Sequence, residues 1–301
     1  MNKTALLLIL SVILLFPFGM KSKNNEMTVA TYNIRVINRQ DSIDGNGWTT
    51  RCPHIADVIK FHGFDIFGTQ EGFRPALDDL KACLPGYEYI GVGCDNGADA
   101  GGHNAIFYNT DKFDLLDDGT FWLSETPDTV SFGWDAAYRR VCTWGKFRHR
   151  DSGDTFVYFN LHMDHIGKVA PGESAKLIVG KIKELRGQFP AILSGDFNVD
   201  QDSECYRIIS DSGLLNDAYD TAALRYIKTS TFNNYDPSGS FMTSKGDIQR
   251  IDHMFFSPEF NVKKYGVLTD TYRSQNPDST TTARVPSDHY PVMVVVDLKA
   301  K

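Results

Sequence analysis

Carboxylate and amide side chains recur at points where short apolar runs of the sequence end. Asn33 ends the first run, and Glu71 follows the second. Asp196 and Asn198 come just after a third run, at Leu193. An ionised carboxylate near an apolar core is costly unless it is paired or bound to a metal. We therefore expect these side chains to converge around a divalent cation.

A second group of polar side chains lies in three further segments, each within or next to a predicted strand. Its members are Asn160, His162, Asp252, Asp288 and His289. The candidate ligands are mostly oxygen atoms, which favours Mg²⁺ or Mn²⁺ over a thiolate-rich zinc site. Taken singly, each pattern is more often a turn or a cap than a catalytic group. It is the joint occurrence of these patterns, in this order along the chain, that indicates a functional site.

The elements that must position these residues are predicted to be short strands separated by loops and a few helices. Strands are expected where β-branched and aromatic residues concentrate, at 28–34, 64–69, 105–108, 155–161, 191–193, 251–256 and 292–296. Helices are expected at 51–61, 75–83 and 173–186. The last has one apolar face and Gly187 as its stop signal. The polar segments 228–247 and 271–284 are predicted to be surface loops.

Length and composition indicate one exported domain. The chain has 301 residues, 42% apolar and 23% charged, as in globular proteins. Residues 1–22 resemble a signal peptide, because Lys3 precedes an apolar run that is shorter than the ~20 residues of a membrane span. An uncleaved N-terminal anchor is the alternative. We expect a monomeric domain at 27–299 with no membrane span, periplasmic or extracellular if the source is bacterial.

Charge and cysteine content narrow the classes of partner. The net charge is −7. An acidic surface repels long polyanions, so no stable complex with duplex nucleic acid is expected. The five cysteines include no C-x-x-C pair, which argues against a zinc ribbon or a redox motif. Their number leaves room for one or two disulfides and at least one free thiol.

The order of the motifs resembles that of the endonuclease/exonuclease/phosphatase superfamily. The matching segments, between about Thr28 and Leu298, are Asn33, Gln70–Glu71, Gly195–Asn198, Arg250–Asp252 and Ser287–His289. A closer likeness is to the bacterial proteins related to nocturnin and the poly(A)-degrading enzymes. It rests on segments that include 32–35, 121–127 and 133–137. The resemblance implies an α/β fold, a four-layer sandwich of two packed, mainly antiparallel β-sheets flanked by helices.

The resemblance also implies a role for each site residue in a metal-dependent phosphoric ester hydrolase. Glu71, Asn33 and Asp288 would bind Mg²⁺ or Mn²⁺. Asp196 would orient or deprotonate the attacking water, and Asn198 would hold that water or a phosphoryl oxygen. His289, oriented by Asp252, would contact the phosphate as acid, base or fixed charge, and His162 would be a second donor. The predicted substrate-binding residues are Arg140, Asn160 and Trp134.

Two departures and two rival hypotheses remain at this point. Arg35 stands where the abasic-site endonucleases carry an acid, and residues 169–172 replace an Ala-Arg pair of close relatives. The segment Asn160–His165 resembles part of the zinc motif of the metallo-β-lactamase fold. A non-catalytic binding module on the same scaffold is the other rival. For an enzyme, a small or single-stranded phosphoester is preferred as substrate, with a secreted nuclease acting on DNA or RNA as the alternative.

Overall fold

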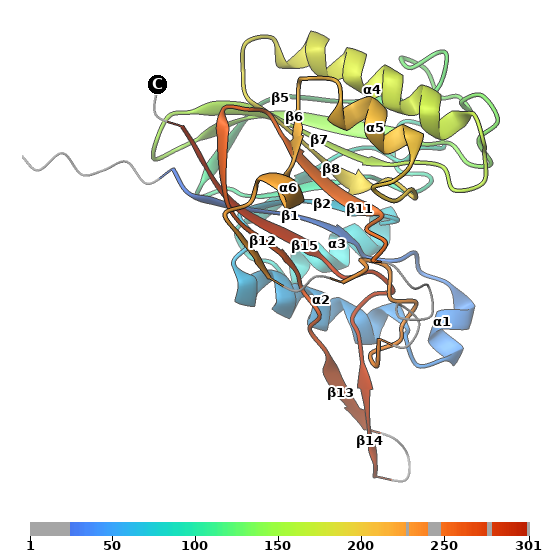
Figure 1. Cartoon of the computed structure of the whole chain (residues 1–301). Helices are drawn as coiled ribbons and strands as arrows, with labels where there is room; N and C mark the ends of the chain where they lie inside the picture. Colours follow the sequence, from blue (N-terminus) through green and yellow to red (C-terminus); the bar gives the residue numbers. More distant parts are fainter. Residues whose placement is uncertain (1–24, 227–228, 240–247, 276–278, 300–301) are drawn as a thin grey trace, which may run out of the picture.

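Two β-sheets packed face to face form the body of the protein, and helices cover the outer side of each sheet (Figure 1). The computed structural model describes residues 25–226, 229–239, 248–275 and 279–299. The predicted signal peptide, residues 1–22, lies outside the described residues. The arrangement confirms the predicted four-layer α/β sandwich.

The first sheet brings two site residues together at its centre. Its strand order is β10 (Leu224–Tyr226), β12 (Phe260–Val267), β15 (Val292–Leu298), β1 (Met27–Asn33), β2 (Ile66–Gln70), β4 (Ile106–Asn109) and β3 (Tyr87–Ile90). Strands β1 and β2 are parallel, and Asn33 is paired with Gln70. The side chains of Asn33 and Glu71 therefore emerge next to each other, where both strands end.

The second sheet brings three more site residues together at one of its ends. Its order is β5 (Phe113–Trp122), β6 (Val141–His149), β7 (Thr155–His162), β8 (Ala191–Asp196), β11 (Asp252–Phe256) and β9 (Asn216–Asp217). His162 is paired with Asp196 across the parallel strands β7 and β8, and Asp252 is paired with Asp196 across the antiparallel strands β8 and β11. This register places one imidazole and two carboxylates side by side.

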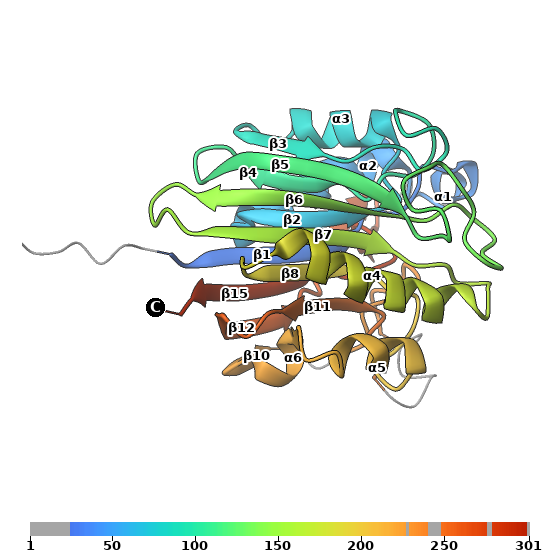
Figure 2. The same ribbon diagram turned by 90° about the horizontal axis from the view of Figure 1, so that it is seen from above.

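Helices cover the outer faces because each presents an apolar stripe to its sheet. Helices α2 (Trp48–His62) and α3 (Arg74–Ala82) pack on the first sheet. Helices α4 (Ala170–Arg186) and α5 (Glu204–Ser210) pack on the second, and Figure 2 shows α4 lying across its strands. Two short helices, α1 (Arg39–Ile43) and α6 (Ala218–Thr221), lie in connections.

An apolar core with a few polar ties joins the two sheets. Strand β1 has almost no exposed face, because Val29 points into the core between the sheets and Ala30 points toward the helices. The hydroxyl of Tyr158 crosses between the sheets and donates to the carbonyl of Ala30 at 2.8 Å. It accepts a bond from the amide of Gly68 at 3.0 Å. Such ties fix the two sheets, and hence the two halves of the site, relative to each other.

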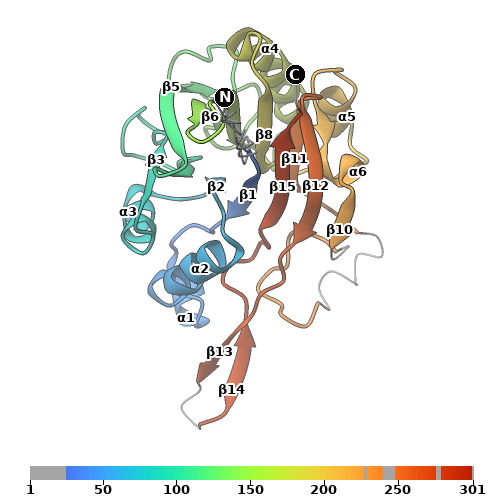
Figure 3. The same ribbon diagram turned by 90° about the vertical axis from the view of Figure 1, so that its left-hand side faces the viewer.

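The predicted strands and helices are confirmed, but one predicted loop is wrong. Segment 271–284 contains the hairpin β13 (Tyr272–Gln275) and β14 (Thr281–Arg284), which projects from the body (Figures 1 and 3). Apart from Tyr272, its residues are exposed or half-buried and mostly polar, so its strands lack the apolar alternation that marks a half-buried strand. The predicted loop 228–247 lies partly outside the described residues, and 229–239 holds no regular element.

Two further sequence expectations concern thiols and membranes. All five cysteines are free thiols, so the structure contains none of the disulfides for which their number left room. In the part of the chain that the structure describes, no helix combines the length and the apolar character needed to cross a bilayer.

Candidate active site

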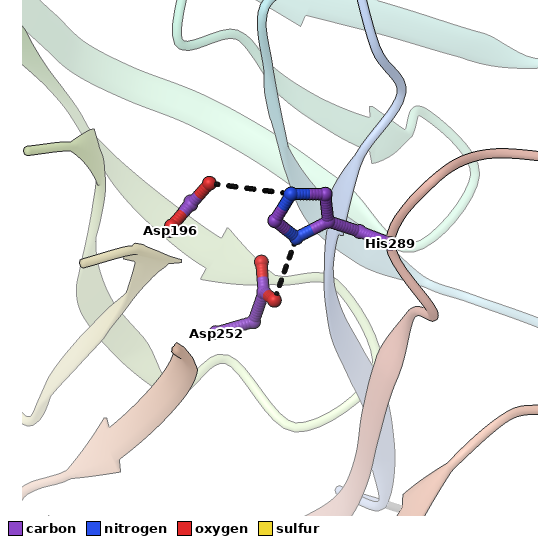
Figure 4. Close-up of side chains that lie close together, drawn as sticks. All are labelled: Asp196, Asp252 and His289. Carbon is purple, nitrogen blue, oxygen red and sulfur yellow. Dashed lines mark hydrogen bonds and ion pairs between the residues drawn. The ribbon is translucent and has the colours of Figure 1, made fainter. Parts of the chain in front are cut away.

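Two carboxylates and one imidazole form the buried centre of the site (Figure 4). Asp196 ends β8, Asp252 begins β11, and His289 lies just before β15. Nδ1 of His289 is 2.9 Å from Oδ2 of Asp252, and Nε2 is 3.7 Å from Oδ2 of Asp196. All three are at most 5% exposed. The imidazole is thus held between two carboxylates in a position that solvent barely reaches.

This burial and pairing change the proton affinities of the group. Burial alone would lower the pKa of His289, but the charges of Asp252 and Asp196 outweigh it and hold that pKa well above its usual value. Burial, reinforced by the charge of Asp252, raises the pKa of Asp196 to about 7. Such a centre holds a cationic imidazole beside a carboxylate that can accept a proton near neutral pH.

Asn198 and His162 flank Asp196. The backbone amide of Asn198 donates to Oδ1 of Asp196 at 2.9 Å, from a residue in the left-handed region at φ 54°. Nδ2 of Asn198 donates to the carbonyl of Met163 and lies 2.9 Å from Nε2 of His162. Nε2 therefore accepts, and the ring proton is assigned to Nδ1. Burial, with the nearby charge of Arg140, lowers the pKa of His162 well below its usual value, so the ring is neutral.

Glu71 and Asn33 form the second half of the site. Glu71 is in the left-handed region at φ 64°, which a non-glycine residue rarely adopts and which here accompanies a site position. Its Oε2 accepts from the amide of Val36 at 2.9 Å, and its Oε1 lies 3.3 Å from Nδ2 of Asn33. The same Nδ2 donates to Oδ2 of Asp196 at 3.0 Å. Asn33 therefore links the Glu71 half to the Asp196 half.

Asp288 completes this half, with Arg35 as its ion-pair partner. NH1 of Arg35 is 3.3 Å from Oδ2 of Asp288, and Nε is 3.1 Å from Oδ2 of Asp41. Burial raises the pKa of Asp288, and the charge of Glu71 adds to the rise, while those of His289 and Arg35 oppose it. Two carboxylates, those of Asp41 and Asp288, thus face one guanidinium.

The residues predicted to bind a metal fit a divalent cation. Glu71, Asp288 and Asn33 supply carboxylate and amide oxygens, which suit Mg²⁺ or Mn²⁺. Nδ2 of Asn33, and not its Oδ1, faces Glu71, so ligation of one ion by both residues requires the amide to turn. Asp196, Asp252 and His289 also lie with ligand atoms within 4.8 Å of one another. That group fits less well, because a cationic imidazole has no free lone pair.

A cavity of about 430 Å³ opens onto this centre. Glu71 and His162 line it. Asn33 links Glu71 to Asp196, and His162 lies directly beside Asp196. Arg140 also lines it, with NH2 3.1 Å from Nδ1 of His165 and Nε 3.5 Å from Oδ1 of Asp164. The cavity is therefore lined by fixed cations and by His162, the neighbour of Asp196, while Asp196 itself does not line it.

Two predicted substrate contacts are not where the sequence suggested. Asn160 is 0% exposed, and its amide bonds the carbonyls of Thr69 and Ala105 and the side chain of Gln70. It ties the two sheets together, and we correct its assignment to a structural one. Trp134 does not line the cavity; its backbone amide donates to Glu125.

The structure also adds residues that sequence reasoning did not place in the site. Arg35, noted only as a departure from a family pattern, lines the cavity beside Glu71. Asp95, Phe132 and Arg139 line it from two loops. The position of Arg35 two residues after Asn33 was a signal that could have identified it. The loop residues carry no periodic pattern that would have identified them.

Comparisons with known proteins agree with this geometry. A family model described as the Endonuclease/Exonuclease/phosphatase family matches residues 30–289. A crystal structure of a protein of that family from Bacteroides thetaiotaomicron is 53% identical, with a TM-score of 0.87, and the match covers 92% of this chain and 99% of that one. The catalytic domain of human nocturnin, 16% identical at a TM-score of 0.59 over 91% and 95% of the chains, shares the fold.

A second solved structure bears a more specific name. It is the mannosyl-6-phosphatase of Bacteroides thetaiotaomicron VPI-5482, which is 54% identical to this chain, with a TM-score of 0.85. The match covers 90% of this chain and 99% of that protein. The likeness therefore extends over most of both chains.

Proposed function

The chain belongs to the endonuclease/exonuclease/phosphatase family, whose chemistry is phosphoester hydrolysis, and from this premise we propose that it is a divalent-metal-dependent phosphatase of small sugar phosphates. The observation that carries the proposal is the buried Asp196–His289–Asp252 group beside Glu71, beneath a cavity of about 430 Å³. That volume lies in the lower part of the range for small-molecule sites. The similarity to a mannosyl-6-phosphatase makes mannose 6-phosphate the first substrate to test.

Two of the three arginines that line the cavity are the proposed partners of the phosphate. Arg35 and Arg140 both line it, and each guanidinium is held by a carboxylate, Asp288 in one case and Asp164 in the other. Guanidinium groups match phosphate oxygens in geometry and stay charged at all relevant pH values. We expect them to hold the phosphate with its phosphorus above Asp196.

The reaction is a displacement by water. A water oxygen bonds to phosphorus, and the bond from phosphorus to the ester oxygen breaks. One proton of the water passes to Asp196, whose raised pKa makes it a suitable acceptor near neutral pH. The departing alkoxide takes up a proton from solvent, which gives inorganic phosphate and the free sugar. The cationic imidazole of His289 offsets negative charge that develops beside Asp196.

Glu71, Asp288 and Asn33 are the residues that would hold the divalent cation. When bound, the ion would polarise a phosphoryl oxygen and offset charge on the leaving group. Export of the protein, predicted from residues 1–22, remains part of the proposal and rests on the sequence alone.

The test is phosphate release from a panel of esters. The full-length protein is assayed with mannose 6-phosphate, p-nitrophenyl phosphate, bis-p-nitrophenyl phosphate, short RNA and duplex DNA, with Mg²⁺ or Mn²⁺ and with EDTA. We expect the highest kcat/KM for mannose 6-phosphate, loss of activity with EDTA and recovery when the metal is returned. Faster cleavage of RNA or DNA than of any monoester would replace the phosphatase proposal with the nuclease alternative.

A further inference from the structure

Three side chains from two separate loops line the cavity together. Arg139 places NH1 3.3 Å from Oδ1 of Asp95, and its guanidinium lies over the ring of Phe132, 4.3 Å from the centroid. Phe132 is 50% exposed, so half of its surface remains open. The side chain of Asp95 is 51% exposed. Both therefore keep surface available to a ligand in the cavity.

The loop that carries Asp95, residues 91–102, is held in one conformation. The backbone amide of Asp95 donates to the carbonyl of Ala100 at 3.0 Å. The side chain of Asn96 accepts from the amides of Ala98 and Ala100. A Cβ at Gly93 would lie 2.1 Å from the carbonyl oxygen of Ala100, so only glycine allows this close approach. The Asp95 carboxylate is thus positioned before any ligand arrives.

The loop that carries Phe132 and Arg139, residues 123–140, is also tied to the body. The amide of Leu123 donates to the carbonyl of Arg140 at 2.8 Å, which closes the loop at its base. The carboxylate of Asp135 accepts from the amides of Val169 and Ala170, at the start of α4. Two pre-organised loops, rather than a flexible lid, therefore form this side of the cavity.

The chemistry of the three side chains suits the neutral body of a sugar. A carboxylate accepts hydrogen bonds from hydroxyl groups, and a guanidinium donates to them. Nε of Arg139 is buried and has no hydrogen-bond partner among the described residues. An aromatic face packs against apolar C–H groups. Asp95 lines the cavity, whereas the carboxylates that pair with Arg35 and Arg140 do not, so a phosphate beside Arg139 would also face a carboxylate.

We propose that Asp95, Arg139 and Phe132 form a subsite that binds the hydroxyl-bearing ring of a sugar phosphate, while Arg35 and Arg140 hold its phosphate. This inference rests on the proposed function, because it assigns the part of the substrate that the proposed reaction leaves unchanged. Under this proposal, one part of the cavity binds the anionic phosphate and another part binds the neutral sugar ring. A nucleic-acid strand, which carries a phosphate on every nucleotide, fits such a division poorly.

The test compares two substrates with the same reacting group. Mannose 6-phosphate has the sugar ring, and p-nitrophenyl phosphate does not. The variants are Asp95→Ala and Phe132→Ala, with Asp99→Ala as the matched control. Asp99 lies in the same loop as Asp95, is 73% exposed and pairs with Arg74, and it does not line the cavity.

We expect Asp95→Ala to lower the preference for mannose 6-phosphate over p-nitrophenyl phosphate, measured as the ratio of their kcat/KM values, by about tenfold. The loss should come from a higher KM for the sugar phosphate. Phe132→Ala should shift the ratio in the same direction, and Asp99→Ala should leave both substrates unaffected. An unchanged ratio in Asp95→Ala would overturn the subsite.

Calorimetric binding separates this proposal from the proposed function. Mannose 6-phosphate and inorganic phosphate are titrated into the wild type and Asp95→Ala, each first shown to have the same melting temperature. If the wild type hydrolyses no phosphomonoester but Asp95→Ala weakens sugar phosphate binding relative to inorganic phosphate, the reaction is wrong and the subsite stands. Equal weakening of both ligands, or none, would overturn the subsite whatever the enzyme hydrolyses.

Discussion

The buried centre and the loop wall of the cavity are built in opposite ways. Asp196 and Asp252 lie at strand ends and His289 lies just before a strand. All three are at most 5% exposed, and His289 pairs with both carboxylates. Asp95 and Phe132 lie on loops and are about half exposed. Proton transfer needs a desolvated environment that shifts pKa values, whereas recognition needs surface that a ligand can reach. One scaffold provides both because the strand ends form the floor beneath the loops.

This difference between the buried centre and the loop wall predicts different kinetic effects for substitutions in each. A change in the buried centre should lower kcat for every substrate, because each substrate presents the same phosphorus to it. A change in the loop wall should raise KM for sugar substrates. The cations Arg35 and Arg140, which line the same cavity, should affect the binding of every phosphate.

The largest effect is expected for Asp196→Asn. The amide cannot accept the proton of the attacking water, so kcat should fall by about 10²–10⁴-fold, the range for general-base catalysis. KM should change little. Phosphate release under saturating substrate measures this, with the exposed Asp211→Asn as control. A kcat within threefold of that control would remove Asp196 from the mechanism.

Asp252→Asn is expected to have a smaller effect with a distinct signature. Asp252 raises the pKa of His289, so the variant should lose the cationic imidazole at a lower pH than the wild type. At pH 7 we expect a loss in kcat of about 10²-fold, as for removal of an electrostatic stabiliser. The alkaline limb of the kcat profile should move toward acid. A uniform loss at all pH values would indicate a purely structural role.

The wild type should lose activity on acidification. Asp196 must be ionised to accept a proton, and burial raises its pKa to about 7. The active form is therefore present above that pH and is lost as the pH falls through it. We expect kcat to fall about tenfold per pH unit below this point, as for one titrating group. A kcat that stays constant down to pH 5 would contradict the assignment of Asp196 as base.

Arg140→Gln should have the smallest effect and act on both substrates. The guanidinium lines the cavity and is held by Asp164, so its loss removes a charge-assisted contact to phosphate. KM should rise by about tenfold for mannose 6-phosphate and p-nitrophenyl phosphate alike. A rise for the sugar substrate alone would instead place Arg140 in the sugar subsite.

The buried centre could be predicted from the sequence because its residues adjoin recognisable strands. Asp196 and Asp252 each lie at the end of an apolar run, and strand ends converge at sheet edges. Asn160 shows where this reasoning fails. It lies two positions before His162 on β7 and so points to the same face, but the first sheet still covers that position. Whether a residue lies under the facing sheet or beyond its edge depends on how the two sheets pack, which the sequence pattern of one strand does not show.

The loop wall could not be predicted. Asp95 and Phe132 lie in segments without periodicity, and their meeting depends on turns fixed by Gly93 and by Asp135. The hairpin β13–β14 was missed for a related reason. Its strands pair with each other and not with the main sheets, so their sequence lacks the apolar alternation that predicts a strand.

The most direct test is a crystal structure with Mn²⁺ and inorganic phosphate, with the ion located by its anomalous scattering. If the buried centre transfers the proton and other carboxylates hold the metal, Mn²⁺ should bind to Glu71 and Asp288. Phosphate should lie in the cavity next to Arg140 and His162. Mn²⁺ bound among Asp196, Asp252 and His289 would contradict this assignment, because those groups could not then serve as proton acceptor and fixed cation.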